Sequence, residues 1–282
     1  MKKVSSPILL LSLPFFLFIQ AQTYAKEPHQ PAHWSYTGHG NPAQWANLNP
    51  EFETCAKGLT QSPINIQQAI KADLPSLDFQ YQETIPSLVN NGHTIQINLA
   101  KGNVLKVGEQ QYELLQFHFH TPSEEQINGK RSSMVAHFVH QSTDGKLGVV
   151  ALLIKSGAQN KAFSIIFQHL PKKCETITVE NLKLDLKAML PQNKTYYSFS
   201  GSLTTPPCSE NVQWMVLKHA ISLSPAQIKA FKNLLLNSSL FEFNFSIIFG
   251  FWSSPFASRY LGTAAILRKK SGVCSIASKR FL

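Results

Sequence analysis

Alternation of apolar and polar residues dominates the middle of the chain. Stretches that alternate in this way, or that are apolar throughout, cover residues 93–99, 112–120, 134–140, 147–154 and 212–217. Such stretches predict β-strands. Turn sequences at Asn90, Asn128 and Asp144 separate several of them and are short enough to join antiparallel neighbours.

Helical patterns are fewer. The clearest covers Ser224–Leu236, where Ser224 can cap the helix, Pro225 suits its first position and Gln227 completes a capping box. A second helix is predicted at about Asn160–His169. Because the chain has no internal repeat or low-complexity linker, we predict a mainly β (α+β) single domain. It should have a large twisted, mostly antiparallel central sheet and a few short peripheral helices.

The N-terminal segment has the composition of a secretory signal peptide. Lys2 and Lys3 precede an apolar run from Ile8 to Ile19, which is shorter than the roughly 20 residues that span a membrane. We therefore expect cleavage near Ala25 and a periplasmic or secreted protein. Export permits disulfides, and the chain holds four cysteines whose pairing the spacing alone does not fix.

Charge is unevenly distributed along the chain. The formal net charge is +10, but residues 26–239 hold 18 basic and 15 acidic residues. Much of the excess lies in residues 240–282, where six basic residues accompany only Glu242. Residues 26–239 are therefore close to neutral, which argues against a nucleic-acid partner.

Two histidines lie one residue apart in the predicted strand 112–120. Successive side chains of a strand point to opposite faces, so His118 and His120 share one face with Gln116. Leu115 and two phenylalanines form the opposite, apolar face. The two imidazoles are then roughly 6 to 7 Å apart along the strand, close enough to bind one metal ion. Isolated polar residues on a surface strand are the simpler explanation unless further ligands are present.

The next predicted strand supplies a third candidate ligand. His137 and His140 point to its opposite faces. If this strand pairs with the preceding one through the turn near Asn128, His137 lies across from His118 and His120. Three histidines that leave a fourth position open are typical of a catalytic zinc site. The alternative is that these histidines are ordinary polar residues of a half-exposed strand.

Six short sequence segments, spread along the chain, occur in a characteristic order. They are HWSYTGHGNPAQW, QSPINI, NNGH, QFHFHTPSE, HFVH and GSLTTPPCSE. The set resembles the alpha-class carbonic anhydrases, in particular exported bacterial members. It extends over about residues 34 to 239, so the resemblance implies one such domain in residues 26–239.

The resemblance implies a zinc lyase that acts on carbon dioxide and bicarbonate. One Zn²⁺ ion per chain, held by His118, His120 and His137, would stabilise a hydroxide that attacks carbon dioxide and yields bicarbonate and a proton. The resemblance also assigns Thr204 to accept a hydrogen bond from this hydroxide. Glu124 would then accept the Thr204 proton.

Further site residues follow from matching positions in the family. His93 is the expected proton shuttle, because histidine exchanges protons near neutral pH. Three residues match positions that hold the connecting waters: Tyr36, Asn91 and Gln96. Six match the substrate pocket: Val139, Val149, Leu203, Thr205, Val212 and Trp214. Gln116 is the expected partner of a ligand, and Cys55 and Cys208 match a disulfide pair.

Two departures from the family lie near the third ligand. The family usually has a glutamate two residues before that histidine, and a histidine directly after the orienting glutamate. This chain has Val135 and Glu125 at these positions. We hypothesise that Glu125 supplies to His137 the carboxylate that Val135 lacks. A smaller change places Asn41 where glycine is common.

Residues 240–282 do not resemble the family. They have a Phe-rich first half and a basic second half, where the family has further sheet strands, so we expect an incomplete core. Three explanations are open: an out-of-frame translation of the true C-terminus, a divergent tail that contacts membranes, and a mispredicted stop. Two other functions also stay open, a metal-free carbonic-anhydrase-like surface protein and a membrane-attached interaction protein. The sequence leaves the oligomeric state open.

Overall fold

The computed structural model describes residues 33–181 and 183–235 of the chain. The predicted signal peptide (residues 1–25) and the atypical tail (residues 240–282) lie outside these ranges. None of the helices within them is long and apolar enough to cross a membrane.

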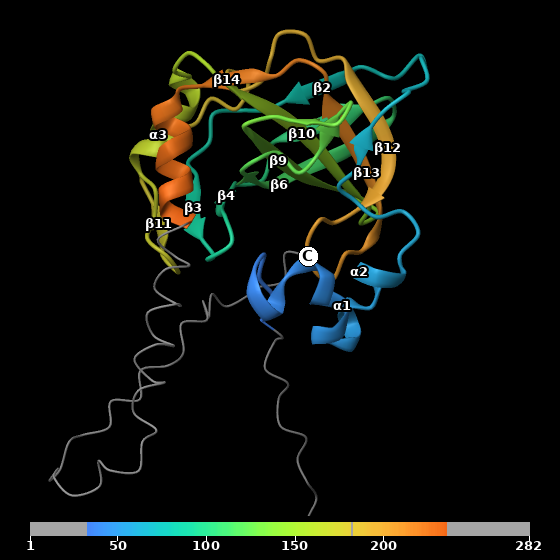
Figure 1. Cartoon of the computed structure of the whole chain (residues 1–282). Helices are drawn as coiled ribbons and strands as arrows, with labels where there is room; N and C mark the ends of the chain where they lie inside the picture. The colour runs from blue at the N-terminus through green and yellow to red at the C-terminus, as the bar shows by residue number, and fades with distance from the viewer. Residues whose placement is uncertain (1–32, 182, 236–282) are drawn as a thin grey trace, which may run out of the picture. The chain divides into compact units, whose positions relative to one another are not determined.

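Eleven of the described strands form one large sheet (Figure 1). Its main path has the order β11 (Thr176–Thr178), β3 (Ser87–Asn90), β4 (Ile95–Asn98), β6 (Gln110–His120), β9 (Met134–Ser142), β10 (Leu147–Ser156), β13 (Glu210–Leu217) and β12 (Tyr196–Ser202). The other three strands of this sheet are β2 (Leu77–Gln80), β5 (Val104–Val107) and β14 (Ile221–Leu223). A separate small sheet contains β1 (Asn65–Ile66), β7 (Gln126–Ile127) and β8 (Lys130–Arg131).

Pairing within the large sheet is mostly antiparallel, as predicted. β10 is the exception, because it pairs in parallel with β13 and β14. Parallel neighbours need a long crossover connection, and the chain between β10 and β13 provides one. All five predicted strands are present, as β4, β6, β9, β10 and β13. β4 begins only at Ile95, so His93 lies in the turn before it.

The two faces of this sheet bury different clusters of apolar residues. Alternation along β9 sends Phe138 to one face and Val135 to the other. We call the first the core face; it holds the larger cluster, to which α3 (Lys161–Gln168) and a helix over residues 225–235 contribute. We call the second the site face; its smaller cluster contains Val135 and Trp214.

Both predicted helices are present, and the one after Ser224 begins at the expected cap. The Asn160 side chain accepts a hydrogen bond from the Ala162 N–H at 3.0 Å at the start of α3. Ser224 Oγ accepts from the Gln227 N–H at 3.2 Å, and Gln227 Oε1 accepts from the Ser224 N–H at 3.0 Å, which completes the capping box. Five short helices precede the sheet: η1 (Gly38–Gly40), η2 (Pro42–Gln44), α1 (Trp45–Leu48), η3 (Pro50–Phe52) and α2 (Thr54–Lys57).

A bulge in β6 makes one prediction wrong. The pairing of β6 with β9 shifts between Leu114 and Gln116, so Leu115 is an additional residue in β6. Leu114, rather than Leu115, therefore joins Phe117 in the core-face cluster. The bulge leaves Gln116 beside His118, to which it is hydrogen-bonded.

The loop between β12 and β13, which we call the Thr204 loop (residues 203–209), is held from two sides. A disulfide between Cys55 and Cys208 joins it to α2, as the resemblance implied. Ser62 and Ser202 exchange hydrogen bonds next to it, at 2.9 Å from the Ser62 N–H and 3.1 Å from the Ser202 N–H. These contacts fix the backbone on which Thr204 stands.

Among the described residues, β12 is the last strand at one end of the sheet's main path. A groove of about 1290 Å³ lies beside it, lined mainly by residues 64–77 and 192–199. One exposed apolar side chain of this groove, Ile70, is 92% accessible.

Candidate metal centre

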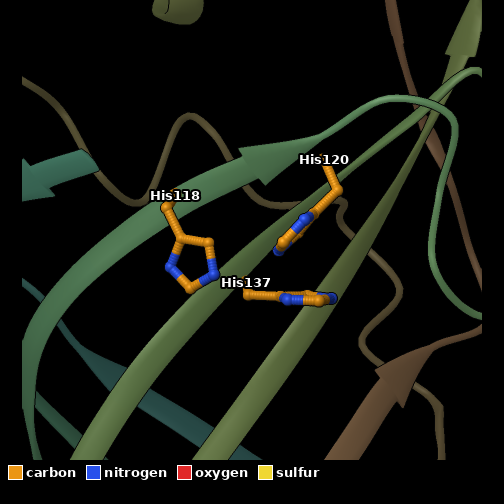
Figure 2. Close-up of side chains that lie close together, drawn as sticks. All are labelled: His118, His120 and His137. Carbon is orange, nitrogen blue, oxygen red and sulfur yellow. The ribbon is translucent and has the colours of Figure 1, made fainter. Parts of the chain in front are cut away.

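Strands β6 and β9 bring three histidines together on the site face (Figure 2). The antiparallel register places His118 directly opposite His137. Ring centroids lie 5.0 Å apart for His118 and His120, 5.5 Å for His118 and His137, and 4.7 Å for His120 and His137. One ring nitrogen from each lies within 4.8 Å of the other two. Nitrogen ligands around tetrahedral zinc are about 3.3 Å apart, so small ring movements suffice to bind one ion.

In two of the three rings, one nitrogen forms a hydrogen bond with a side-chain oxygen. His118 Nδ1 lies 2.9 Å from Gln116 Oε1. His137 Nε2 lies 2.7 Å from Glu125 Oε1, and this carboxylate comes from the segment between β6 and β7. Because both oxygens accept hydrogen bonds, each ring keeps its second nitrogen as a lone-pair donor.

The third ring has a nitrogen without a partner. His120 Nδ1 lies 3.3 Å from Glu124 Oε1. His120 Nε2 is buried and forms no hydrogen bond with any described residue. A buried polar atom without a partner is costly, and a metal ion at the centre of the three rings would satisfy it.

The electrostatics of the cluster favour metal binding. Burial, together with the nearby His137, lowers the pKa of His118 to about 3 and that of His120 well below its ordinary value. Both rings are therefore neutral near pH 7, which leaves a lone pair for a metal. Imidazole nitrogens suit zinc, and metal binding displaces a proton from a ligand that carries one, so the residues present fit the ion that the sequence predicts.

The pKa values of two adjacent carboxyl groups shift in opposite directions. Burial raises the pKa of Glu124 to about 7, although the His137 charge and a hydrogen bond from Thr204 oppose the rise. Burial would also raise the pKa of Glu125, but the charge and hydrogen bond of His137 outweigh it, so this pKa is lowered. Burial lowers the pKa of His137, and Glu125 reverses the effect, so the net shift is upward.

A pocket of about 160 Å³ opens beside the three histidines. Fourteen of the predicted site residues line it: Tyr36, Asn91, His93, Gln96, Gln116, His118, His120, His137, Val139, Val149, Leu203, Thr204, Thr205 and Trp214. Val212 does not line this pocket, since it is packed in the site-face cluster behind it and only 1% exposed. Glu124 and Glu125 lie behind the histidines and contact them from there.

Two residues that line the pocket were missed in the sequence. The Trp34 ring stacks on the His93 ring, with centroids 3.9 Å apart and an angle of 13° between the planes. Thr94 donates a hydrogen bond of 2.6 Å to the Phe119 carbonyl and so ties the end of β6 to the turn that carries His93. Trp34 is two residues from the predicted site residue Tyr36, and this was the signal in the sequence that it lies near the pocket.

Comparisons with known proteins agree on one family. A family model described as eukaryotic-type carbonic anhydrase matches residues 40–244. A carbonic anhydrase of Pectobacterium carotovorum is 42% identical over 203 residues, which are 72% of this chain and 83% of that protein. The alpha-carbonic anhydrase structure of Photobacterium profundum has a TM-score of 0.68 and 41% identity, over 72% of this chain and 92% of that one. The alpha-carbonic anhydrase of Thermovibrio ammonificans, solved with the inhibitor sulfanilamide, has a TM-score of 0.71 and 37% identity, over 73% and 92%.

Proposed function

The chain belongs to the eukaryotic-type, or alpha, family of carbonic anhydrases, and we propose that it interconverts carbon dioxide and bicarbonate with one zinc ion. The observation that carries the proposal is the convergence of His118, His120 and His137, whose ligand atoms lie within 4.8 Å of one another. The partnerless, buried His120 Nε2 is independent support. Three protein ligands leave one position open, as in catalytic zinc sites.

Zinc, when bound, supplies Lewis acidity, which lets water ionise near neutral pH and become the nucleophile toward carbon dioxide. The chain's own residues hold and orient this chemistry. The amide of Gln116 and the carboxylate of Glu125 keep the His118 and His137 rings each in one tautomer, with the free nitrogen available for the ion.

The pocket suits a small apolar substrate. Val139, Val149, Leu203 and Trp214 line it together with the three histidines. Carbon dioxide has no net dipole, so an apolar surface can hold it without competing for the hydrogen bonds of the nucleophile. The volume of about 160 Å³ leaves room for the substrate and a few waters.

Thr204 is proposed to orient the nucleophile. Thr204 lies near enough to Glu124 to lower the pKa of that carboxyl, and in this proposal its hydroxyl donates a hydrogen bond to the ionised carboxylate. The Thr204 oxygen is then left to accept a hydrogen bond from the nucleophile, which directs a lone pair toward carbon dioxide. The disulfide at Cys208 keeps the Thr204 loop in place.

His93 is proposed to carry protons between the site and solvent. It lines the same pocket, on the turn between β3 and β4. Tyr36, Asn91 and Gln96 line the pocket as well and offer polar groups for connecting waters. Imidazole can take up and release protons near neutral pH, which suits this role.

We further propose that the protein works outside the cytoplasm after cleavage near Ala25. The Cys55–Cys208 disulfide supports this location, because stable disulfides form mainly in exported proteins. Carbon dioxide and bicarbonate are the proposed small-molecule partners. Membrane contact through residues 240–282 remains a secondary hypothesis that concerns residues outside the described ranges.

Zinc content and carbon dioxide hydration, measured on the same purified sample, test the proposed function. The unaltered chain should contain about one zinc ion and be active, while His118→Ala should lose both. A folded, soluble chain with neither zinc nor activity would contradict the proposal. It would favour the metal-free alternative.

A further inference from the structure

We propose that Glu125 is the positioning residue that holds His137 ready for the metal, an inference that rests on the proposed function. Glu125 Oε1 lies 2.7 Å from His137 Nε2, and the Glu125 side chain is only 1% exposed. In the family the equivalent carboxylate normally projects from position 135. Here Val135 is fully buried in the site-face cluster, so the carboxylate reaches the ring from a different segment.

The contact determines which nitrogen of His137 can bind a metal. A carboxylate oxygen only accepts, so Nε2 carries the hydrogen and Nδ1 keeps the lone pair. Gln116 has the opposite effect on His118, because its oxygen contacts Nδ1 and leaves Nε2 as the donor. Loss of Glu125 would let the His137 ring rotate or change tautomer, and Nδ1 would no longer be held toward the other ligands.

The segment that carries Glu125 is fixed well enough to position it. Ser123 Oγ donates to the Glu125 carbonyl at 2.8 Å and accepts from the Ser132 N–H at 2.8 Å. Arg131 donates to the carbonyl oxygens of Ser123 and Glu124, at 2.5 and 2.8 Å. The segment between β6 and β7 is thus tied to β8 and to Ser132, two residues before β9, the strand that carries His137.

Glu124 and Glu125 contact different candidate ligands. Glu124 Oε1 lies 3.3 Å from His120 Nδ1, whereas its other oxygen is 3.9 Å from His137 Nδ1. Glu125 contacts only Nε2 of His137 among the ligand nitrogens, at 2.7 Å. Its second oxygen, Oε2, is buried without a hydrogen-bond partner among the described residues. A buried charge with an unsatisfied oxygen adds little stability, so we attribute the pair to orientation of the ligand.

Zinc affinity, measured by competition with a chromogenic chelator on the full chain, tests the inference without relying on activity. Glu125→Ala should bind zinc about 10- to 100-fold more weakly than the unaltered chain. Ser123→Ala is the matched control, because it loosens the same segment and keeps the carboxylate. It should bind zinc nearly as well as the unaltered chain.

A second measurement reports on orientation directly. In ¹⁵N-histidine NMR spectra of the zinc-loaded protein, His137 should be metallated at Nδ1 in the unaltered chain and heterogeneous in Glu125→Ala. The double variant Glu125→Ala/Val135→Glu returns a carboxylate from β9 and should recover much of the affinity. If Glu125→Ala does not fold, Glu125→Gln keeps the shape and removes the charge, and weaker zinc binding is again expected.

The outcomes separate this inference from the proposed function. Equal zinc affinity and the same NMR signature in the unaltered chain and in the Glu125 variants would overturn the inference alone. An equal loss in Ser123→Ala would also overturn it, since the integrity of the segment would then explain the effect. No zinc binding by the unaltered chain would overturn the proposed function, and the inference with it.

Discussion

Strand β9 carries a buried histidine on each of its faces, and the two have different surroundings. On the site face, His137 contacts Glu125 through Nε2 and keeps its other nitrogen for a ligand. On the core face, both nitrogens of His140 are occupied. Its Nδ1 lies 3.2 Å from the Gly148 carbonyl oxygen and its Nε2 lies 2.6 Å from the Tyr81 hydroxyl.

Burial alone does not distinguish these two histidines. His137 is 1% exposed and His140 is 0% exposed, so neither belongs to a half-exposed strand. Burial lowers the pKa of His140 to about 4, against weaker opposing hydrogen bonds from backbone carbonyls, so its ring is neutral. The difference is the free nitrogen of His137 and the two further imidazoles that converge on it. A core histidine and a metal ligand therefore differ in their partners.

The largest effect on activity is expected from a substitution beside the three histidines. It should leave the stability of the fold unchanged. Thr204→Ala should lower kcat/KM for carbon dioxide hydration by about 10²- to 10³-fold, because the nucleophile loses its orienting acceptor. Stopped-flow kinetics measure the change, and Thr178→Ala in β11, which does not line the pocket, is the matched control with activity retained. A Thr204→Ala protein that has lost zinc would place Thr204 in the metal site, against this account.

A smaller loss is expected from the proposed proton shuttle, His93. His93→Ala should reduce kcat by about 10²-fold in weak buffer, because proton release becomes limiting. Added imidazole should restore the rate, since an external base can replace the missing side chain. Zinc content and kcat/KM should stay unchanged. An activity loss that no buffer rescues would argue that His93 supports the structure of the turn.

A substitution on the core face should lower the stability of the fold and leave the zinc content unchanged. His140→Ala removes two buried hydrogen bonds and leaves a cavity, so it should lower the free energy of unfolding by about 3 kcal/mol. Chemical denaturation measures this loss, and zinc content per folded chain should be unchanged. If His140→Ala lost zinc but kept normal stability, His140 would behave as a metal ligand and would not differ from His137.

The smallest effect concerns the pH dependence of stability. His140 has a folded-state pKa of about 4 and an ordinary unfolded value of about 6.5. The unfolded chain therefore binds the proton first, and this site's contribution to stability falls as pH decreases from about 6.5 to about 4. Between pH 7 and pH 5 the loss is roughly 2 kcal/mol. His140→Phe, compared with the unaltered chain by denaturation at both pH values, should show a correspondingly shallower decline.

Much of the fold could be predicted because the pattern is regular where the sheet is buried. The five strands with clear alternation and the two capped helices are all present. The short strands β2, β3, β5 and β11 were not predicted, since three or four residues give too little periodicity. β12 was missed as well, because small and polar residues in 196–202 weaken its pattern.

The histidine ligands of the site could be predicted from the sequence. The contacts that surround them were harder to predict. His118 and His120 are adjacent on one strand face, and this spacing is visible in the sequence. Leu115 was assigned to the wrong face, because a bulge leaves no mark in the alternation. The stacking of Trp34 on His93 depends on how the N-terminal segment folds back, which no local pattern encodes. The family match ends at residue 244, close to the point where the predicted tail begins.

Zinc content of His137→Ala and His140→Ala, purified in parallel with the unaltered chain, tests the central claim most directly. The account predicts about one zinc ion per folded chain in the unaltered protein and in His140→Ala, and almost none in His137→Ala. Equal zinc content in the two variants would contradict it. The three converging imidazoles would then not be the metal site.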